Sequence, residues 1–310
     1  MPRLTVFTPT YNRAHTLSRA FDSLMKQSVK DFEWLIIDDG STDSTEELIN
    51  TFKETADFDI RYFWKPNGGR HTAVNYSYDK LRTEYVVTCD SDDALTPNAV
   101  ESILNTWDSI PENERERYWC VTGREMNAET GEMVGLPFPE NINALSGKKK
   151  RKAILRCPGE KHCCRRTDVL IQHPFPVYED TRFVTENTVW EAINKKYDQY
   201  CVNDFYGYYY TNSADSLSKS NLRKFSRYRT FYYAGVFYVN EMLHELTFNK
   251  DVRFFTVNLS RCAMLTDTPY KVVMRALKSP FRRFLVTLGY PISWLWIKTH
   301  INKNNYNKEG

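Results

Sequence analysis

Three carboxylates that follow one apolar run mark the first place in the sequence where chemistry could occur. The run 85–88 leads directly into Cys89, Asp90, Ser91, Asp92 and Asp93. Buried parallel strands read as continuous β-branched or aromatic runs, and ligands bind beyond their carboxyl ends. Carboxylates this close raise each other's pKa unless a cation neutralises them, and hard Mn²⁺ or Mg²⁺ ions prefer oxygen ligands of this type. The spacing alone fits an acidic surface turn equally well.

Repeated strand and helix patterns position this stretch. Apolar runs predict strands at 4–8, 32–37, 60–64 and 85–88, and helical spacing predicts helices at 17–25, after residue 43, and at about 71–81. Polar turns at 9–13, 38–43 and 67–70 follow the first three strands. The repeat predicts an open α/β sheet, mixed but mainly parallel, flanked by helices.

The middle of the chain gives weaker patterns. We expect a helix at about 97–108, strands at 119–123, 162–166 and 203–210, a helix after residue 187, and a mobile polar loop at 212–220. The basic run 148–152 is typical of a solvated loop, although it could also contact an anionic acceptor.

The last 90 or so residues predict a helical, aromatic extension. Within it Lys271, Arg275, Lys278 and Arg282 recur at helical spacing opposite an apolar face, and no acidic residue occurs between 268 and 308. Pro280 and Pro291 should break or kink the segment. A basic amphipathic segment lying in a membrane interface and a packing or dimerising helix both fit this pattern.

Bulk properties exclude several classes of protein. The 310 residues carry 42 basic and 39 acidic side chains, a net charge of +3 that does not indicate a nucleic-acid binder. Seven scattered cysteines do not form a disulfide framework, so we expect a reducing, cytoplasmic setting. The start of the sequence leaves no room for a signal peptide before the first strand, and no apolar stretch reaches the roughly 20 residues of a membrane span. The cluster Cys157, His162, Cys163 and Cys164 lacks the paired spacing of a zinc site.

Four motifs in order resemble a known family. They are the segments 8–13 (TPTYNR), 37–43 (IDDGSTD), 67–75 (NGGRHTAVN) and 90–93 (DSDD). Together they resemble the inverting, nucleotide-sugar-dependent glycosyltransferases of family 2, which have the GT-A fold. The resemblance is firm for residues 1–105, fainter to about 220 and absent afterwards. It implies a GT-A domain at 1–220, with a nucleotide-binding half at 1–105 and an acceptor-binding half at 106–220. The helical, aromatic pattern described above predicts a separate C-terminal region at 221–310.

The resemblance also implies roles for individual residues. Asp39 would accept the imino hydrogen of the base, Arg70 and Asn75 would contact phosphate, and Asp90 and Asp92 would bind ribose and a Mn²⁺ or Mg²⁺ ion. Among the metal candidates Asp90, Asp92 and Asp93, we favour Asp92 for direct contact. The complete predicted nucleotide site comprises Thr8, Pro9, Thr10, Tyr11, Arg13, Asp38, Asp39, Gly69, Arg70, Asn75, Asp90 and Ser91.

An inverting transfer needs a base for the acceptor hydroxyl, and the family places an acid before a helix for this purpose. Glu186 occupies that place here, although Asn187 replaces the family's second acid. The acids Glu179, Asp180 and Glu191 are close enough in sequence to compete. The resemblance implies a nucleotide-sugar donor, with a UDP-sugar expected, and a glycan or lipid-linked glycan acceptor.

Three other classes of protein fit the sequence less well. A dinucleotide enzyme needs a Gly-x-Gly-x-x-Gly turn after the first strand, where this chain has Pro9 to Arg13. A sugar nucleotidyltransferase would need a glycine-rich, basic N-terminal loop, and a binding protein that lost catalysis would not need the acids at 90, 92 and 186. We therefore expect a cytoplasmic glycosyltransferase that binds no nucleic acid. Two alternatives stay open for residues 271–301, namely peripheral contact with an anionic membrane and a packing or dimer face.

Overall fold

The computed structural model describes residues 1–210, 224–241 and 250–301. The chain folds into two compact units. Unit 1 comprises Met1–Phe175 and Trp190–Ala214, and unit 2 comprises Pro176–Val189 and Asp215–Gly310. The chain therefore leaves unit 1 after Phe175 and returns to it at Trp190, so the intervening segment belongs to unit 2.

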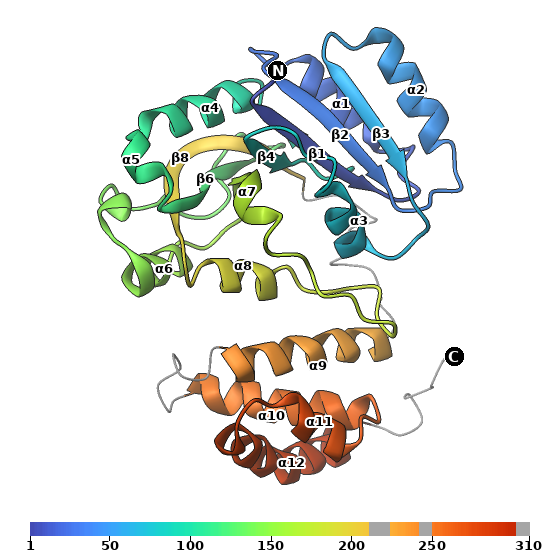
Figure 1. Cartoon of the computed structure of the whole chain (residues 1–310), viewed down its shortest axis with the longest axis vertical. Helices are drawn as coiled ribbons and strands as arrows, with labels where there is room; N and C mark the ends of the chain where they lie inside the picture. The colour runs from blue at the N-terminus through green and yellow to red at the C-terminus, as the bar shows by residue number, and fades with distance from the viewer. Residues whose placement is uncertain (211–223, 242–249, 302–310) are drawn as a thin grey trace. The chain divides into compact units, whose positions relative to one another are not determined.

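Unit 1 is built on one mixed sheet (Figure 1). The eight described strands have the order β3-β2-β1-β4-β7-β6-β8-β5. The strands are β1 Leu4–Thr10, β2 Phe32–Asp38, β3 Asp59–Trp64, β4 Tyr85–Thr88, β5 Ala94–Leu95, β6 Tyr118–Asn127, β7 Lys161–Arg166 and β8 Asp198–Tyr209. Strands β1 to β4 pair in parallel, whereas β7 is antiparallel to both β4 and β6. The predicted open α/β sheet is confirmed.

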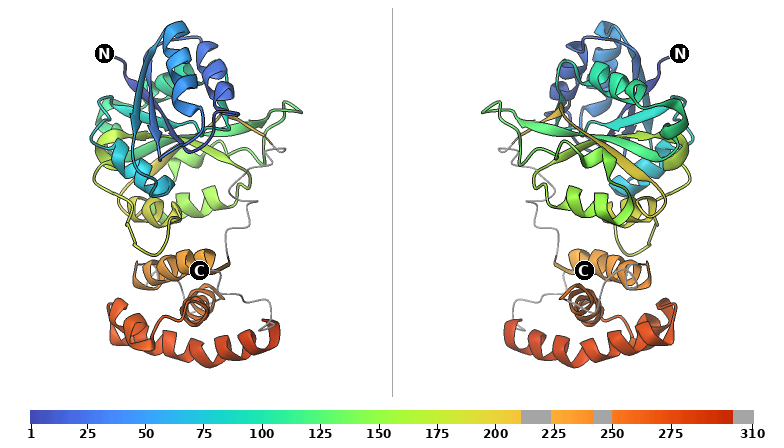
Figure 2. Two further views of the ribbon diagram at one scale, coloured as in Figure 1. Left: turned by 90° about the vertical axis from the view of Figure 1, so that its right-hand side faces the viewer. Right: turned by 90° about the vertical axis from the view of Figure 1, so that its left-hand side faces the viewer.

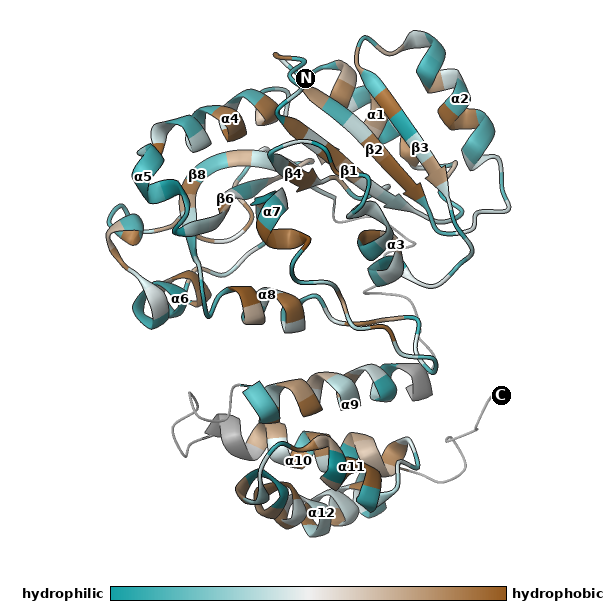
Figure 3. Ribbon diagram, viewed as in Figure 1, coloured by the Kyte–Doolittle hydropathy of each residue, from teal (hydrophilic) through white to brown (hydrophobic). Residues whose placement is uncertain are grey.

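Helices connect these strands along residues 1–210. They are α1 Leu17–Met25, α2 Thr45–Thr55, α3 Arg70–Ser77, α4 Ala99–Ser109, α5 Glu112–Arg115, the 3-10 turn Ile142–Ala144, α6 Gly147–Leu155, α7 Thr167–Leu170 and α8 Asn187–Ile193. Helices α1, α2 and α4 share one continuous apolar core with the sheet, in which Trp34 and Trp107 are fully buried. Figure 3 shows hydrophobic residues along β1, β2 and β4, as buried parallel strands require.

The parallel register fixes where polar loops gather. Leu4 of β1 lies opposite Phe32 of β2 and Tyr85 of β4, so the three strands run side by side in the same direction. Their following loops therefore emerge at the same edge of the sheet. The apolar runs predicted the first four strands to within two residues at each end, and β4 matches its predicted range.

Two expectations for unit 1 were wrong. The basic run 148–152 is not a loop, because it lies inside α6, and Lys150 in it is buried with its Nζ 3.2 Å from Asn143 Oδ1 and over the ring of Tyr118. Asn143 and Tyr118 lie outside the basic run and offset the cost of burying the Lys150 ammonium group. A run of basic residues alone does not predict such burial. Helix α3 ends at Ser77 rather than near residue 81.

Unit 2 contains the segment 176–189 and the helices α9 Lys224–Glu241, α10 Lys250–Leu265, α11 Tyr270–Ala276 and α12 Pro280–His300. Helix α10 packs against both α9 and α12 (Figure 2). A small core of Val239, Leu259, Val273 and Val286 joins the four helices. The helical prediction for this part of the chain is confirmed for the residues described.

The two prolines act differently from each other. Pro280 starts α12, where its missing N–H costs nothing, and Ser279 caps the same end by accepting from Arg282 N at 3.3 Å. Pro291 lies inside α12, which continues past it to His300. Among the described residues, no helix combines the length and apolar character needed to cross a membrane. The predicted loop at 212–220 and the predicted domain border at 220 lie outside the described residues.

Candidate functional site

The polar turns after β1, β2, β3 and β4 form the candidate site of unit 1. Each predicted motif follows one of these strands, and the strands are neighbours in the sheet. The sheet therefore brings the residues after Thr10, Asp38, Trp64 and Thr88 to one edge. An edge of this kind is where open α/β sheets bind ligands.

The acidic turn after β4 concentrates negative charge. Burial, followed by the charges of Asp90 and Asp92, raises the pKa of Asp93 to about 8. Arg70, the first residue of α3, offsets part of this charge, because its guanidinium donates to Asp90 Oδ1 at 2.8 Å. The structure thus brings the predicted phosphate-binding cation next to the predicted metal-binding acids.

Two residues that the sequence did not single out for this site lie behind the acidic turn. His162 of β7 donates from Nε2 to the carbonyl oxygen of Thr88 at 2.8 Å, and its Nδ1 lies 3.2 Å from Glu125 Oε1. Burial alone would lower the pKa of His162, but the hydrogen bond and charge of Glu125 outweigh it and raise the pKa. A protonated ring can donate to both acceptors, and its charge opposes that of the acidic turn.

Arg19 of α1 was also missed by the sequence interpretation. Its guanidinium donates to the carbonyl oxygen of Asp92 and lies 4.0 Å from the ring centroid of Tyr210. Arg19 therefore supports the backbone of the acidic turn from a separate helix. The helical pattern of α1 predicts only that Arg19 lies outside the apolar face. Nothing in the sequence indicates that Arg19 contacts residue 92.

Asp39 organises the neighbouring turn. Its Oδ1 accepts from Lys65 Nζ at 2.5 Å and from Gly68 N at 3.0 Å, while Oδ2 accepts from Gly69 N at 2.7 Å. Gly69 has a φ of 93°, which favours glycine at this position. Asp39 thus holds the loop that leads into α3 and Arg70, a structural role in addition to the base contact predicted for it.

Asp38, the last residue of β2, is almost fully buried and shapes the same edge. Its carboxylate accepts from Ser41 N at 2.8 Å and from the Tyr62 hydroxyl at 2.9 Å. Gly40 adopts a φ of 87°, and a side chain there would meet the backbone of Asn67. This buried carboxylate stabilises the turn between β2 and α2.

The residues after β1 divide into buried and accessible ones. Thr8 is fully buried, donates to the carbonyl oxygen of Cys89 at 2.6 Å and accepts from Trp34 Nε1 at 2.9 Å. Pro9 and Thr10 are also buried, whereas Arg13 is partly exposed. Tyr11 is 48% exposed, so it offers the accessible aromatic surface that a nucleoside pocket needs. The hydroxyl of Thr8 is already engaged inside the sheet.

Helix α3 contributes two side chains with unexpected surroundings. Asn75 donates to the carbonyl oxygen of Phe175 and accepts from its N–H, each at 2.8 Å, so both ends of its amide bind the backbone of unit 1. His71 is buried, and burial lowers its pKa below the usual value, which favours the neutral ring. Neither ring nitrogen of His71 has a hydrogen-bond partner among the residues that the structure describes.

The acidic turn can hold a divalent cation only together with other oxygen donors. Within residues 1–210, 224–241 and 250–301, no three His, Cys, Asp or Glu side chains form a complete metal site. One or two carboxylates completed by phosphate oxygens and water are nevertheless the usual ligands of Mg²⁺. Burial and the charges of Asp90 and Asp92 together raise the pKa of Asp93, and a bound cation would relieve the repulsion among these carboxylates.

The cysteines near this region are free thiols, as are all seven in the chain. Cys164 lies in the core under the sheet, Cys157 belongs to a separate apolar cluster, and Cys163 lies 3.5 Å from the hydroxyl of Thr122. His162 is engaged with Glu125. These four side chains therefore occupy different surroundings.

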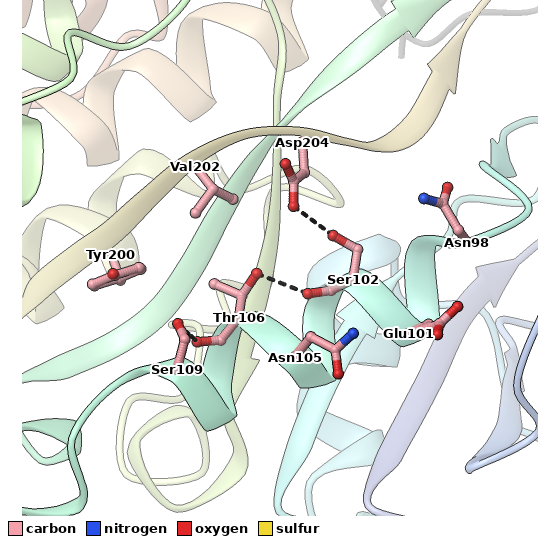
Figure 4. A pocket seen from close by; sticks show the side chains of 9 residues that line it. All are labelled: Asn98, Glu101, Ser102, Asn105, Thr106, Ser109, Tyr200, Val202 and Asp204. Atoms are coloured by element: carbon pink, nitrogen blue, oxygen red, sulfur yellow. Dashed lines mark hydrogen bonds between the residues drawn. The ribbon is translucent and has the colours of Figure 1, made fainter.

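A polar groove lies elsewhere in unit 1, between α4 and β8 (Figure 4). Its volume is about 460 Å³, and a hydrogen bond of 2.7 Å from Ser102 to Asp204 crosses it. Asn98, Glu101, Asn105 and Tyr200 also line it, and it contains none of the predicted site residues. The groove is separate from the motif-bearing edge of the sheet.

Comparison with known families identifies the motif-bearing half. Residues 5–113 match the family model described as glycosyl transferase family 2. The chain carries a glycosyl transferase family 2 domain. The match covers β1 to α4 and includes every predicted nucleotide and metal residue of this domain.

Curated relatives resemble the same part of the chain. An uncharacterized glycosyltransferase of Rickettsia typhi is 34% identical over 104 residues, which are 34% of this chain and 31% of that protein. The chondroitin synthase of Pasteurella multocida is 39% identical over 104 residues, which are 34% of this chain and 11% of that protein. The chain thus matches a third or less of the length of these relatives.

Solved structures resemble a larger share of the chain. TarS of Staphylococcus aureus, residues 1–349 in complex with UDP-GlcNAc, has a TM-score of 0.59 and 16% identity, covering 96% of this chain and 91% of that one. A mannosyltransferase of Pyrobaculum calidifontis, in complex with GDP-Man and Mn²⁺, has a TM-score of 0.51 and 16% identity, covering 96% and 84%. The glycosyltransferase domain has the GT-A fold, as predicted, and C-terminal helices follow it.

Glu186 lies outside the residues that match the family model and belongs to unit 2. It directly precedes α8, and its carbonyl oxygen accepts from Val189 N at 2.9 Å. Of the three acids that compete with it, Glu191 is ion-paired with Arg151 at 2.6 Å, and Asp180 is ion-paired with Arg229 at 2.5 Å. Glu179 is exposed. Two of the three competing carboxylates are therefore engaged in ion pairs within their own units.

Proposed function

We propose that this chain is an inverting glycosyltransferase that transfers a sugar from a nucleoside-diphosphate donor, with a UDP-sugar expected, to a glycan or lipid-linked glycan. The observation that carries the proposal is the pairing of Arg70 with Asp90 at the motif-bearing edge of a family 2 domain. A diphosphate needs a cation on one side and a carboxylate-bound metal on the other, and this edge supplies residues for both.

On this proposal, the residues of unit 1 bind the leaving group. Arg70 and the N–H groups at the start of α3 would contact the diphosphate, while Tyr11 and Asp39 would contact the nucleoside. A Mn²⁺ or Mg²⁺ ion bound by Asp92, with Asp90 or Asp93 beside it, would neutralise charge on the departing nucleoside diphosphate. Solved structures of the same fold contain UDP-GlcNAc, or GDP-Man with Mn²⁺, which supports a nucleotide-sugar donor.

The transfer itself is a single displacement. The acceptor oxygen forms a bond to the anomeric carbon, the bond from that carbon to the phosphate oxygen breaks, and the acceptor proton goes to the carboxylate of Glu186. The configuration of the sugar is thereby inverted. The ion pairs of Glu191 and Asp180 count against these two acids as the base, because each carboxylate is already bound by an arginine.

A donor panel tests the proposal. Purified chain is incubated with UDP-GlcNAc, UDP-glucose, UDP-glucuronate and GDP-mannose in turn, with Mn²⁺ or with EDTA, and release of UDP or GDP is measured. We expect one donor to be hydrolysed or transferred in a Mn²⁺-dependent way. Pyrophosphate formed from UTP and a sugar phosphate would indicate a nucleotidyltransferase instead, and nucleotide binding without any release would indicate an inactive binding protein.

A further inference from the structure

Helix α12 carries an apolar stripe that faces away from the rest of unit 2. The side chains on this stripe are between 53% and 59% exposed, and they are Phe281, Phe284, Leu288, Ile292 and Leu295. Steps of three or four residues along an α-helix return to the same face. The five side chains therefore form one continuous apolar strip about 21 Å long, at 1.5 Å of rise per residue.

The opposite face of α12 is the one that holds the helix in place. Ser260 of α10 donates to the carbonyl oxygen of Val286 at 2.9 Å, and Ser293 donates to the carbonyl oxygen of Val257 at 2.9 Å. Gly289 lets the two helices approach, since a side chain there would meet Ser260 and the backbone of Thr256. Packing within unit 2 thus uses the face of Val286, Gly289 and Ser293 and leaves the stripe outward.

Cationic and interfacial side chains border the stripe. Lys298 and Arg283 are exposed on one flank of α12, and Lys298 Nζ lies 3.9 Å from the ring centroid of Trp294, which is 49% exposed. Helix α11, which precedes α12 in the chain, carries two more exposed cations, Lys271 and Arg275. No Asp or Glu occurs between residues 268 and 308 to offset these charges.

We propose that α12 docks unit 2 onto an anionic lipid surface, lying parallel to the membrane with the stripe inserted among the acyl chains. A helix in this position needs an apolar face with cations and tryptophan at its border, which is the arrangement on α12. Anionic headgroups match the positive charge of residues 268–308, a segment without acidic residues in which Lys278 is paired with Glu241 of α9. A second copy of the chain would present the same positive charge and repel the first, so we assign the stripe to lipid.

Vesicle sedimentation of the full chain tests the proposal. The probes are phosphatidylcholine vesicles with and without phosphatidylglycerol, at low and at high salt. We expect the chain to sediment with the phosphatidylglycerol vesicles, less at high salt, and the triple variant Phe284→Ser, Leu288→Ser, Ile292→Ser to bind about tenfold or more weakly. Lys271→Gln with Lys298→Gln should bind several-fold more weakly at low salt, because each cation near the surface contributes to binding.

A matched control separates the stripe from general surface hydrophobicity. Leu155 in unit 1 is 70% exposed, and Leu155→Ser makes the same kind of change away from α12, so it should bind vesicles like the wild type. Circular dichroism checks that each variant keeps its helices. Equal vesicle binding by the wild type and the triple variant would overturn the proposal. It would also be overturned if the wild type bound no vesicles and ultracentrifugation showed that the triple variant had lost self-association.

Discussion

The acidic turn after β4 and the segment 176–189 both carry candidate functional carboxylates, but they are held by different parts of the molecule. The charge of Asp90 in the acidic turn is opposed by Arg70, and His162, whose pKa is raised by Glu125, binds the backbone at Thr88, all within unit 1. In the segment 176–189, Asp180 is held by Arg229 and by the hydroxyl of Tyr233 on α9, all in unit 2. Nucleotide binding and transfer should therefore fail separately when one region is altered.

The largest expected effect is at Glu186. Glu186→Gln keeps the size of the side chain but removes the proton acceptor, so we expect turnover to fall about 10³-fold while nucleotide affinity is unchanged. Turnover is measured by nucleotide release and affinity by calorimetry. Glu179→Gln, in the same segment, is the control and should keep its activity. Normal turnover in Glu186→Gln would remove Glu186 as the base.

The next effect is at Asp92. Asp92→Asn removes one carboxylate charge from the predicted metal site, so Mn²⁺-dependent UDP binding should weaken about 100-fold or more. Calorimetry with UDP, with and without Mn²⁺, measures this loss. Asp204→Asn changes an exposed acid of the groove on β8 and should bind UDP like the wild type. Normal Mn²⁺-dependent binding by Asp92→Asn would shift the metal contact to Asp90 or Asp93.

A smaller effect is expected where α9 holds the segment. The Tyr178 ring stacks on Tyr233 at 3.6 Å, and Asp180 is bound by Arg229, so Asp180→Asn should loosen the segment that bears Glu186. If Glu186 is the base, kcat should fall about tenfold while the donor KM stays the same, because positioning is lost and binding is not. Asp168→Asn breaks an exposed ion pair with Arg166 and serves as the control. A change in donor KM alone would contradict this role.

The last expected effect is on the stability of the fold and not on the reaction. Because the pKa of Asp93 is raised from 3.8 to about 8 in the folded chain, the folded state keeps a proton that the unfolded state has lost between these values. Stability without metal should therefore decline as pH rises from about 4 through 8. Asp93→Asn should flatten this decline and stabilise the chain by about 2 kcal/mol at pH 8. Urea unfolding at pH 6 and pH 8 in EDTA checks it, and parallel pH profiles would contradict it.

The sequence predicted the first four strands and their loops because their signals are local. Each strand is an apolar run that ends in turn residues, and the parallel register follows from the repeated helices between them. The approach of Arg70 to Asp90 could be inferred from motif order alone. The roles within that site could not, because Thr8 and Asn75 point toward partners that lie 81 and 100 residues away.

Residues beyond the motifs were missed for a related reason. Glu125 and His162 meet because β6 and β7 pair with Gly123 opposite His162, a register that neither strand specifies by itself. Lys150 can be buried because its ammonium group donates a hydrogen bond to Asn143 and lies over the ring of Tyr118. A basic run is usually exposed to solvent, so the sequence predicted a loop instead. Such interactions depend on tertiary pairing, whereas composition records only the residue types.

The hydrogen bonds between Asn75 and Phe175 have a consequence for chain entropy. Phe175, where the chain leaves unit 1, is fixed by this amide, and its ring lies 5.6 Å from that of Trp190, where the chain returns. The two ends of the stretch 176–189 are therefore held close together in the folded chain, so the stretch is a closed loop. A closed loop samples fewer conformations than a free chain of equal length, so arranging Glu186 around an incoming acceptor would cost less conformational entropy.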